Sequence, residues 1–253
     1  MSNQSKFFVL TLVLAGLAPQ VVSAAQSRAG MAHYVGSGLA YPTLNHALFV
    51  NPTALVDSPL TSLQASYMLD PGNVHSSITT GGGTAGFGIG YRQNGSSSTE
   101  EFGLAGRINI MTLGATLRTH EFQGLDGDLA ATFDFGAMRL TAIGRGANQG
   151  FDRADVGLGF TSGPFSLGID AKKPLAAGDE SYDFDVGMSV SDGRISAGFG
   201  YTFAYNGASM VAGDIHSGLS FDVTKGAALE AFYKPSTQEW SPGDWVLGAR
   251  FQL

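Results

Sequence analysis

Charged side chains recur at alternate positions in many short apolar stretches of this chain. In an extended strand such a residue points to the face opposite its apolar neighbours. Carboxylates and guanidinium groups gathered on one face can pair with each other, or they can bind a polar group of a ligand. We favour mutual pairing and keep a ligand site as the alternative. The candidate residues are Arg107, Arg118, Asp134, Arg139, Asp170, Asp183, Asp185, His216, Glu230 and Arg250.

His216 is the candidate that most invites a catalytic interpretation, because Ser217 and Ser220 follow it. Ser217 falls on the opposite face of the strand, and Ser220 lies four residues away, so the spacing does not favour a Ser-His-acid triad. No cluster of His residues suggests a metal site, and the chain has no Cys. We therefore predict no enzyme, no metal and no cofactor.

The elements that carry these charges read as β-strands with one apolar face. The last residues are an example: Trp245, Leu247, Phe251 and Leu253 share a face, and Arg250 lies on the other. No segment after the N-terminal region is apolar for 18 residues, so an integral protein would have to be a closed barrel. Lipid outside and a polar interior would produce this alternation, and an Arg facing lipid at the midplane would cost roughly 2–4 kcal/mol.

Fourteen alternating segments can be distinguished between Thr61 and Leu253. The weakest are the second, around His75 to Thr80, and the thirteenth, Leu229 to Tyr233, so twelve strands remain an alternative. The fold class is therefore all-β: a transmembrane antiparallel β-barrel, most consistent with fourteen strands. The strand from Thr61 to Leu69 should pair with Asp244 to Leu253 and close it.

Connection lengths support the same architecture. We expect short turns after even-numbered strands and longer loops after most odd-numbered ones, with both barrel termini at the short-turn, periplasmic end. The longer loops are predicted at Asp70 to Val74, Gln93 to Glu100, His120 to Asp128, Gly146 to Asp155, Lys172 to Ser181, Ala204 to Asp214 and Lys234 to Ser241.

Two of the short turns also predict register. A two-residue turn at Gly136 and Ala137 would pair Asp134 with Arg139, and a turn at residues 224–226 would pair Ser220 with Glu230.

The N-terminus has the features of a secretory signal peptide. Lys6 precedes a mostly apolar run from Phe7 to Leu17, and Val22-Ser23-Ala24 provides small residues for cleavage. We assign residues 1–24 to this signal and expect the outer membrane of a Gram-negative bacterium. The net charge of −7 argues against a nucleic-acid partner.

Residues 25–60 do not alternate and are interrupted by Pro42, Pro52 and Pro59. They are too apolar for a solvated tail. The predicted inward positions of the strands are rich in Gly, Ser and Thr, which leaves room inside the barrel. We therefore expect residues 25–60 to form a plug within a barrel made by residues 61–253.

The N-terminal segment resembles the hatch of the FadL-type family of outer-membrane transporters. The resemblance rests on Gly36 to Tyr41 and on Ala47 to Leu55, which contains Asn51-Pro52 just before the first strand. Thr53 stands where the family usually has Ala. The resemblance implies a fourteen-stranded barrel with an N-terminal hatch and the passage of long-chain fatty acids or other hydrophobic compounds. This chain is much shorter than typical members, and a reduced member could be a small pore, a channel for hydrophobic compounds or a structural protein. We favour a plugged barrel that passes small hydrophobic molecules.

A barrel with a structural or surface-interaction role, without transport, is the second candidate function. The expected partners are outer-membrane lipid, hydrophobic small molecules and, during biogenesis, the barrel-assembly machinery. The alternating C-terminal strand resembles the signal that this machinery reads, although it ends in Leu253 rather than an aromatic residue.

Overall fold

A computed structural model describes most of the chain from residue 39 onward. The described ranges are 39–40, 47–58, 60–68, 74–94, 96–120, 123–224, 226–234 and 244–252. The predicted signal peptide, residues 1–24, lies outside them, as does much of the predicted plug.

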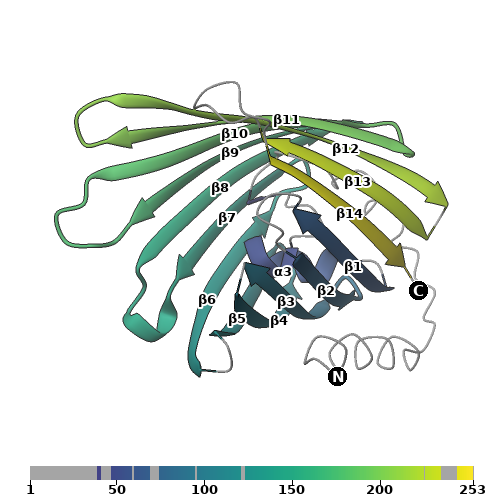
Figure 1. Ribbon diagram of the computed structural model, residues 1–253, viewed down its shortest axis with the longest axis horizontal. Helices are drawn as coiled ribbons and strands as arrows, with labels where there is room; N and C mark the ends of the chain where they lie inside the picture. The colour runs from purple at the N-terminus through teal and green to yellow at the C-terminus, as the bar shows by residue number, and fades with distance from the viewer. Residues whose placement is uncertain are drawn as a thin grey trace.

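The described residues form fourteen antiparallel strands in one closed barrel (Figure 1). Each strand pairs with its neighbours in the sequence. The strands are β1 (Leu60–Met68), β2 (Val74–Gly81), β3 (Ala85–Asn94), β4 (Ser97–Ile108), β5 (Met111–His120), β6 (Gln123–Asp134), β7 (Met138–Arg145), β8 (Arg153–Ser162), β9 (Phe165–Pro174), β10 (Ser181–Ser191), β11 (Ile195–Asn206), β12 (Met210–Thr224), β13 (Ala227–Lys234) and β14 (Asp244–Gln252).

The barrel closes through β1 and β14, as the sequence predicts. Ser62 lies opposite Gln252, and Met68 lies opposite Val246. The two weakest strand predictions, β2 and β13, are both present in the ladder. The fourteen-strand prediction is therefore confirmed, and the twelve-strand alternative is wrong.

The distribution of polarity is inverted relative to a water-soluble protein. Large apolar side chains stand exposed on the outer face, including Leu104 at 51% and Phe165 at 63% exposure. The inner face buries polar groups instead, among them Thr141 and Asp155 at 0%. An outer surface covered in apolar side chains is the arrangement that lipid favours and water does not.

The connections after even-numbered strands are short, as expected. In the β6–β7 turn Gly136 has a φ of 86° and donates its N–H to Asp134 Oδ1 at 2.9 Å. The predicted register follows, with Asp134 opposite Arg139, and Ser220 lies opposite Glu230 in β12 and β13.

Three of the predicted long connections are wrong over most of their length. The segments 93–100, 120–128 and 204–214 are mainly strand, because β3 reaches Asn94, β6 begins at Gln123 and β11 reaches Asn206. Where a strand extends beyond an apolar layer, both of its faces meet water. The alternation then disappears although the backbone ladder continues. Period-two patterning therefore predicts these strands to be shorter than they are.

Short helical segments complete the described fold: α3 (Ala47–Val50), η2 (Pro52–Asp57) and η3 (Ala147–Gln149). α3 contacts β3 and β4, and η2 contacts β2 to β6, so both lie against the wall that these strands form (Figure 1). None of the described helices is long and apolar enough to span a membrane.

Candidate site in the barrel lumen

Asn51 organises the described N-terminal segment. Its side chain caps η2, because Oδ1 accepts the backbone N–H of Thr53 at 3.0 Å and the Thr53 hydroxyl at 2.7 Å. Its Nδ2 donates to the carbonyl oxygen of Leu39 at 2.8 Å. Pro52 occupies the first turn, where the missing N–H has no cost. Asn51 and Pro52 are buried, so this dipeptide holds residues 39 and 51–57 together.

A chain of hydroxyl groups joins this segment to the barrel wall. The Oγ1 atoms of Thr53 and Thr132 lie 2.6 Å apart, and those of Thr132 and Thr141 lie 2.8 Å apart. All three residues are buried. Each hydroxyl can donate once and accept more than once, so the chain satisfies three buried groups in sequence.

Glycines on the inner face allow the segment to approach the strands closely. A Cβ at Gly86 would lie 2.3 Å from the carbonyl carbon of Leu55, and one at Gly114 would lie 2.7 Å from the backbone nitrogen of Thr53. Because these neighbours are backbone atoms, they cannot move aside as a flexible side chain could. Residues 48–57 thus fill the space that the small inward residues leave on this side of the barrel.

Asp57 ties the end of η2 to two arginines of the wall. Its Oδ1 accepts from Arg107 at 2.6 Å, and its Oδ2 accepts from Arg139 at 2.8 Å. Arg139 also pairs with Asp134 at 2.8 Å. Three predicted residues therefore meet here around a carboxylate that sequence patterning did not single out. The cluster lies near the short-turn end, since Arg107 is close to the end of β4 and Asp134 ends β6.

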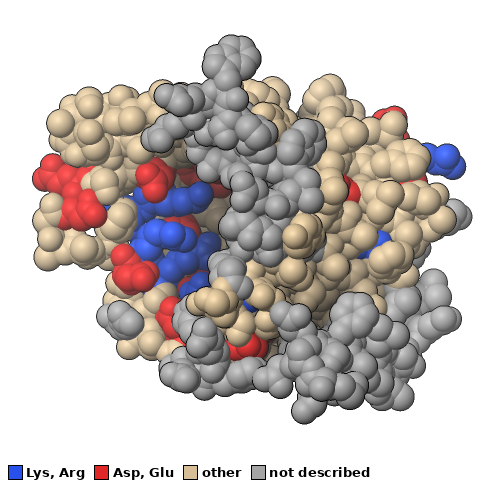
Figure 2. Space-filling view, viewed as in Figure 1, with Lys and Arg blue, Asp and Glu red and all other residues tan. Residues whose placement is uncertain are grey.

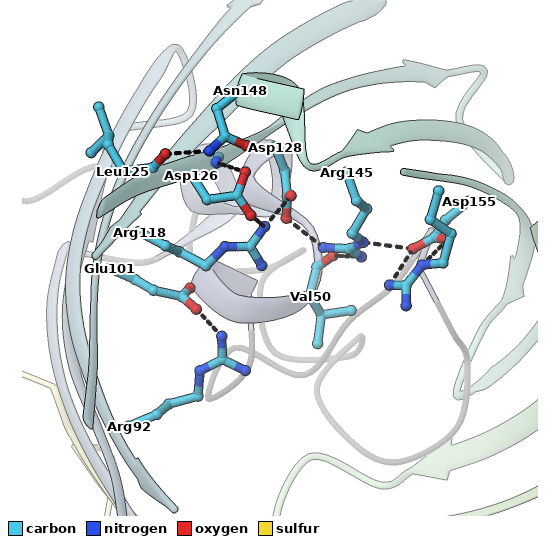
Figure 3. Close-up of polar contacts among 12 residues, drawn as sticks. Val50, Arg92, Glu101, Arg118, Leu125, Asp126, Asp128, Arg145, Asn148 and Asp155 are labelled. Atoms are coloured by element: carbon cyan, nitrogen blue, oxygen red, sulfur yellow. Dashed lines mark hydrogen bonds and ion pairs between the residues drawn. The ribbon is translucent and has the colours of Figure 1, made fainter. Parts of the chain in front are cut away.

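Arg145 forms a second connection to the segment (Figure 3). It donates to Asp155 at 2.6 Å, to Asp128 at 2.7 Å and to the carbonyl oxygen of Val50 at 2.7 Å. Its side chain is 10% exposed, and those of Asp128 and Asp155 are 3% and 0% exposed. Two buried carboxylates and a backbone carbonyl thus share one guanidinium group.

The same row of charges continues over the neighbouring strands. Arg118 pairs with Asp128 and Asp126, Arg153 donates to Asp155 at 2.7 Å, and Arg92 pairs with Glu101. We call the set Arg92, Glu101, Arg118, Asp126, Asp128, Arg145, Arg153 and Asp155 the ion ladder. Its four arginines and four acids balance. Figure 2 shows Lys and Arg side chains gathered in a hollow toward the left, with Asp and Glu side chains around them.

The wall formed by β9 to β12 is built differently. Asp170 accepts the backbone N–H of Leu39 at 2.8 Å and is 2% exposed. Asp185 lies 3.8 Å from both Lys172 and His216, beyond hydrogen-bond distance. His216 lies across Gly200, where a Cβ would be 2.1 Å from its Nε2.

The last three predicted residues lie on β10, β13 and β14. Asp183 is exposed near the start of β10. Arg250 lies 3.9 Å from Glu230 and 3.5 Å from Asp222. The structure thus brings Arg107, Asp134 and Arg139 together, places Arg118 in the ion ladder and leaves Asp170, Asp183, Asp185, His216, Glu230 and Arg250 on other strands.

Sequence patterning missed most of the ion ladder for a specific reason. Asp126 and Asp128 have the same parity as Asp134 in β6, and Arg145 has that of Arg139 in β7. Extending the period of two beyond the apolar stretches would have found these three residues. Asp57 carries no such signal, because it follows an irregular segment and its role depends on two distant strands.

The described side chains of the lumen hold residues 48–57 against the wall. In the part of the chain that the structure describes, no group of three or more His, Cys, Asp or Glu residues could hold a metal ion. His216 lies 3.8 Å from Asp185, and Ser217 lies opposite Phe199, on the outer-face parity.

The fold is that of outer-membrane channel barrels. The solved structures similar to this chain include the toluene transporter TodX of P. putida, with a TM-score of 0.61 and 10% identity over 88% of this chain and 99% of that one. The CymD monoaromatic hydrocarbon channel has a TM-score of 0.59 and 11% identity over 83% and 93%. Omp33 of Acinetobacter baumannii has a TM-score of 0.55 and 12% identity over 76% and 96%.

These similarities establish a shared architecture. No protein-family model matches the chain, and no curated protein matches it either. At identities of 10–12%, the solved structures show the fold of porin-like barrels and leave the cargo to be inferred from the site.

Proposed function

We propose that this protein is an outer-membrane channel that passes small hydrophobic molecules, with its N-terminal segment as a plug. One observation carries the proposal. Residues 48–57 pack on the inner face of one side of the barrel, where they bury Leu48, Leu55 and Val56 and are also tied to the wall by buried polar groups. The polar anchors can exchange with water when the segment moves, and a hydrophobic solute could cover the apolar side chains that the movement exposes.

The family and the location belong to the same proposal. The Asn51-Pro52 cap lies directly before β1, as in the FadL-type hatch that the segment resembles. TodX and CymD carry aromatic hydrocarbons according to their descriptions, and both share this barrel. An exported barrel with an apolar outer face fits the outer membrane of a Gram-negative bacterium, where cell fractionation would recover it.

Flux into vesicles tests the transport claim. We expect purified barrel in proteoliposomes to speed the entry of toluene over protein-free vesicles, without a matching increase for a disaccharide. Because the chain has no Cys, Thr53→Cys with Thr132→Cys gives a single possible disulfide between segment and wall. Oxidation should lower toluene flux, and reduction should restore it. Equal flux in protein-free and protein-containing vesicles would contradict the proposal.

A structural or surface-interaction barrel is the second candidate. The observation that favours it is the balance of the ion ladder, in which each arginine has an acidic partner and Arg145 also holds Val50. A wall paired in this way could fix the segment permanently. The same experiment separates the two functions. If the segment is permanently fixed, neither the oxidised nor the reduced protein should raise toluene flux above that of protein-free vesicles.

A further inference from the structure

A polar pair on the outer face of the barrel has no role in the lumen. Lys173 Nζ donates to the hydroxyl oxygen of Tyr182 at 2.7 Å, and the ammonium lies 4.3 Å from the centre of the same ring. Lys173 is next to the end of β9, and Tyr182 is next to the start of β10. The pair therefore lies at the long-connection end of both strands.

Strand alternation places both side chains outside. Lys173 has the parity of Ile169, which is 44% exposed on the apolar face, and Tyr182 has that of Met188, which is 56% exposed. Lys172, the preceding residue, has the opposite parity and lies near Asp185. A cation on a lipid-facing surface is costly unless its head reaches the polar interface.

A row of aromatic rings extends from this pair across two strands. Tyr182 and Phe184 have ring centres 6.2 Å apart, Phe184 and Phe203 are 5.1 Å apart, and Phe203 and Tyr201 are 6.1 Å apart. Aromatic rings concentrate at the level of lipid headgroups in membrane barrels. This row therefore marks the interface at the long-connection end, with Lys173 at its edge.

The pair has hydrogen-bond donors to spare. An ammonium group carries three N–H donors, and among the described residues Lys173 uses one, on Tyr182. Because the Tyr182 oxygen accepts that bond, its own O–H remains able to donate. The nearby Asp179 accepts from the hydroxyl and the backbone N–H of Ser181 at 2.6 and 2.8 Å, and these bonds, together with the charge of Lys173, lower the pKa of Asp179. Two N–H groups of Lys173 and the O–H of Tyr182 therefore remain able to donate to a molecule outside the barrel.

We propose that Lys173 and Tyr182 bind a phosphate of an outer-leaflet glycolipid of the lipid A type. The phosphate would accept from the ammonium and the phenol, and the acyl chains would lie along Phe184 and Phe203. The ammonium group of Lys173 and the depth set by the rings favour an anionic headgroup, which would compete with Asp179 for the ammonium. The inference rests on the outer-membrane location proposed above, with the long connections on the external side.

Native mass spectrometry of the purified barrel tests this site. The detergent-solubilised protein is titrated with bis-phosphorylated lipid A, with dephosphorylated lipid A and with phosphatidylglycerol. The variants are Lys173→Gln and Tyr182→Phe. The matched control is Lys172→Gln, which makes the same change one residue away on the lumen face. Retention of barrel circular dichroism establishes that each variant is folded.

Lys173→Gln should weaken binding of bis-phosphorylated lipid A by about fivefold, as expected for one interfacial cation. Tyr182→Phe should weaken it less, and Lys172→Gln should leave it unchanged. Dephosphorylated lipid A should bind all four proteins equally. The site is overturned by wild-type affinity in Lys173→Gln, by an equal loss in Lys172→Gln, or by phosphatidylglycerol binding as tightly as lipid A. None of these outcomes depends on toluene flux, so the transport proposal can fail independently.

Discussion

Two sides of the barrel use the same strand geometry for different surroundings. On β2 to β8 the inward side chains meet residues 48–57 through direct hydrogen bonds, close glycine contacts and the ion ladder. On β9 to β12 many inward residues are Ser and Gly, Asp170 makes one hydrogen bond to the backbone of Leu39, and among the described residues Asp185 has no charged partner nearer than 3.8 Å. The wall of the barrel thus holds residues 48–57 by close contacts on β2 to β8, and its charged side chains on β9 to β12 form fewer close pairs.

The largest expected effect comes from removing Arg145. Arg145→Ala would leave Asp128 and Asp155 buried with fewer cations and would release the carbonyl of Val50, at a cost of roughly 3–5 kcal/mol in unfolding free energy. Urea unfolding in vesicles measures this loss. Arg153→Ala is the control, because that side chain is 43% exposed and also reaches Asp155. An equal loss of unfolding free energy in both variants would mean that the contacts of Arg145 with Asp128 and Val50 add no stability.

A methyl group at Gly114 should be the next most disruptive change. Gly114→Ala places a Cβ 2.7 Å from the backbone nitrogen of Thr53, so the segment or the strand must shift. We expect a stability loss of about 1–3 kcal/mol and a higher single-channel conductance. Gly106→Ala is the control, because nothing lies within 4 Å of its added Cβ. Unchanged conductance in Gly114→Ala would mean that the segment does not block the conducting path.

Asn51 allows a finer test of the same side. Asn51→Ala removes the cap of η2 and should cost about 1 kcal/mol in unfolding free energy. Asn51→Asp keeps the oxygen that accepts from Thr53 but loses the Nδ2 donor to Leu39. If the cap dominates, the Asp variant should recover most of the loss. If Asn51→Asp loses as much unfolding free energy as Asn51→Ala, the hydrogen bond to Leu39 contributes more than the cap.

The smallest effect is expected on the other side. His216 is 3.8 Å from Asp185 and forms no close ion pair, so His216→Ala should change the unfolding free energy by no more than about 0.5 kcal/mol. The same unfolding experiment applies. A loss as large as that of Arg145→Ala would remove the contrast between the two sides.

Much of the fold could be predicted because lipid imposes one rule on every strand. Alternation gave the strand number, and the turn at Gly136 gave the pairing of Asp134 with Arg139. The alternation ends where the strands leave the lipid, so the sequence predicts loops for the outer parts of β3, β6 and β11.

The interior was less accessible to the same reasoning. Arg107 and Arg139 could be predicted as inward charges, but their shared partner Asp57 could not, because it joins elements that are distant in the sequence. Lys173 was missed because it falls at a strand end, where a lipid-facing cation breaks the apolar pattern.

Disulfide formation tests most directly whether the N-terminal segment occupies the side of the lumen formed by β2 to β8. Thr53→Cys is combined either with Thr132→Cys on β6 or with Ser220→Cys on β12, and oxidised protein is analysed by peptide mapping. The hydroxyl oxygens of Thr53 and Thr132 are 2.6 Å apart, so the first pair should cross-link rapidly. The second pair should remain reduced. Cross-linking at Ser220, or at both positions equally, would contradict a segment fixed to one side of the barrel.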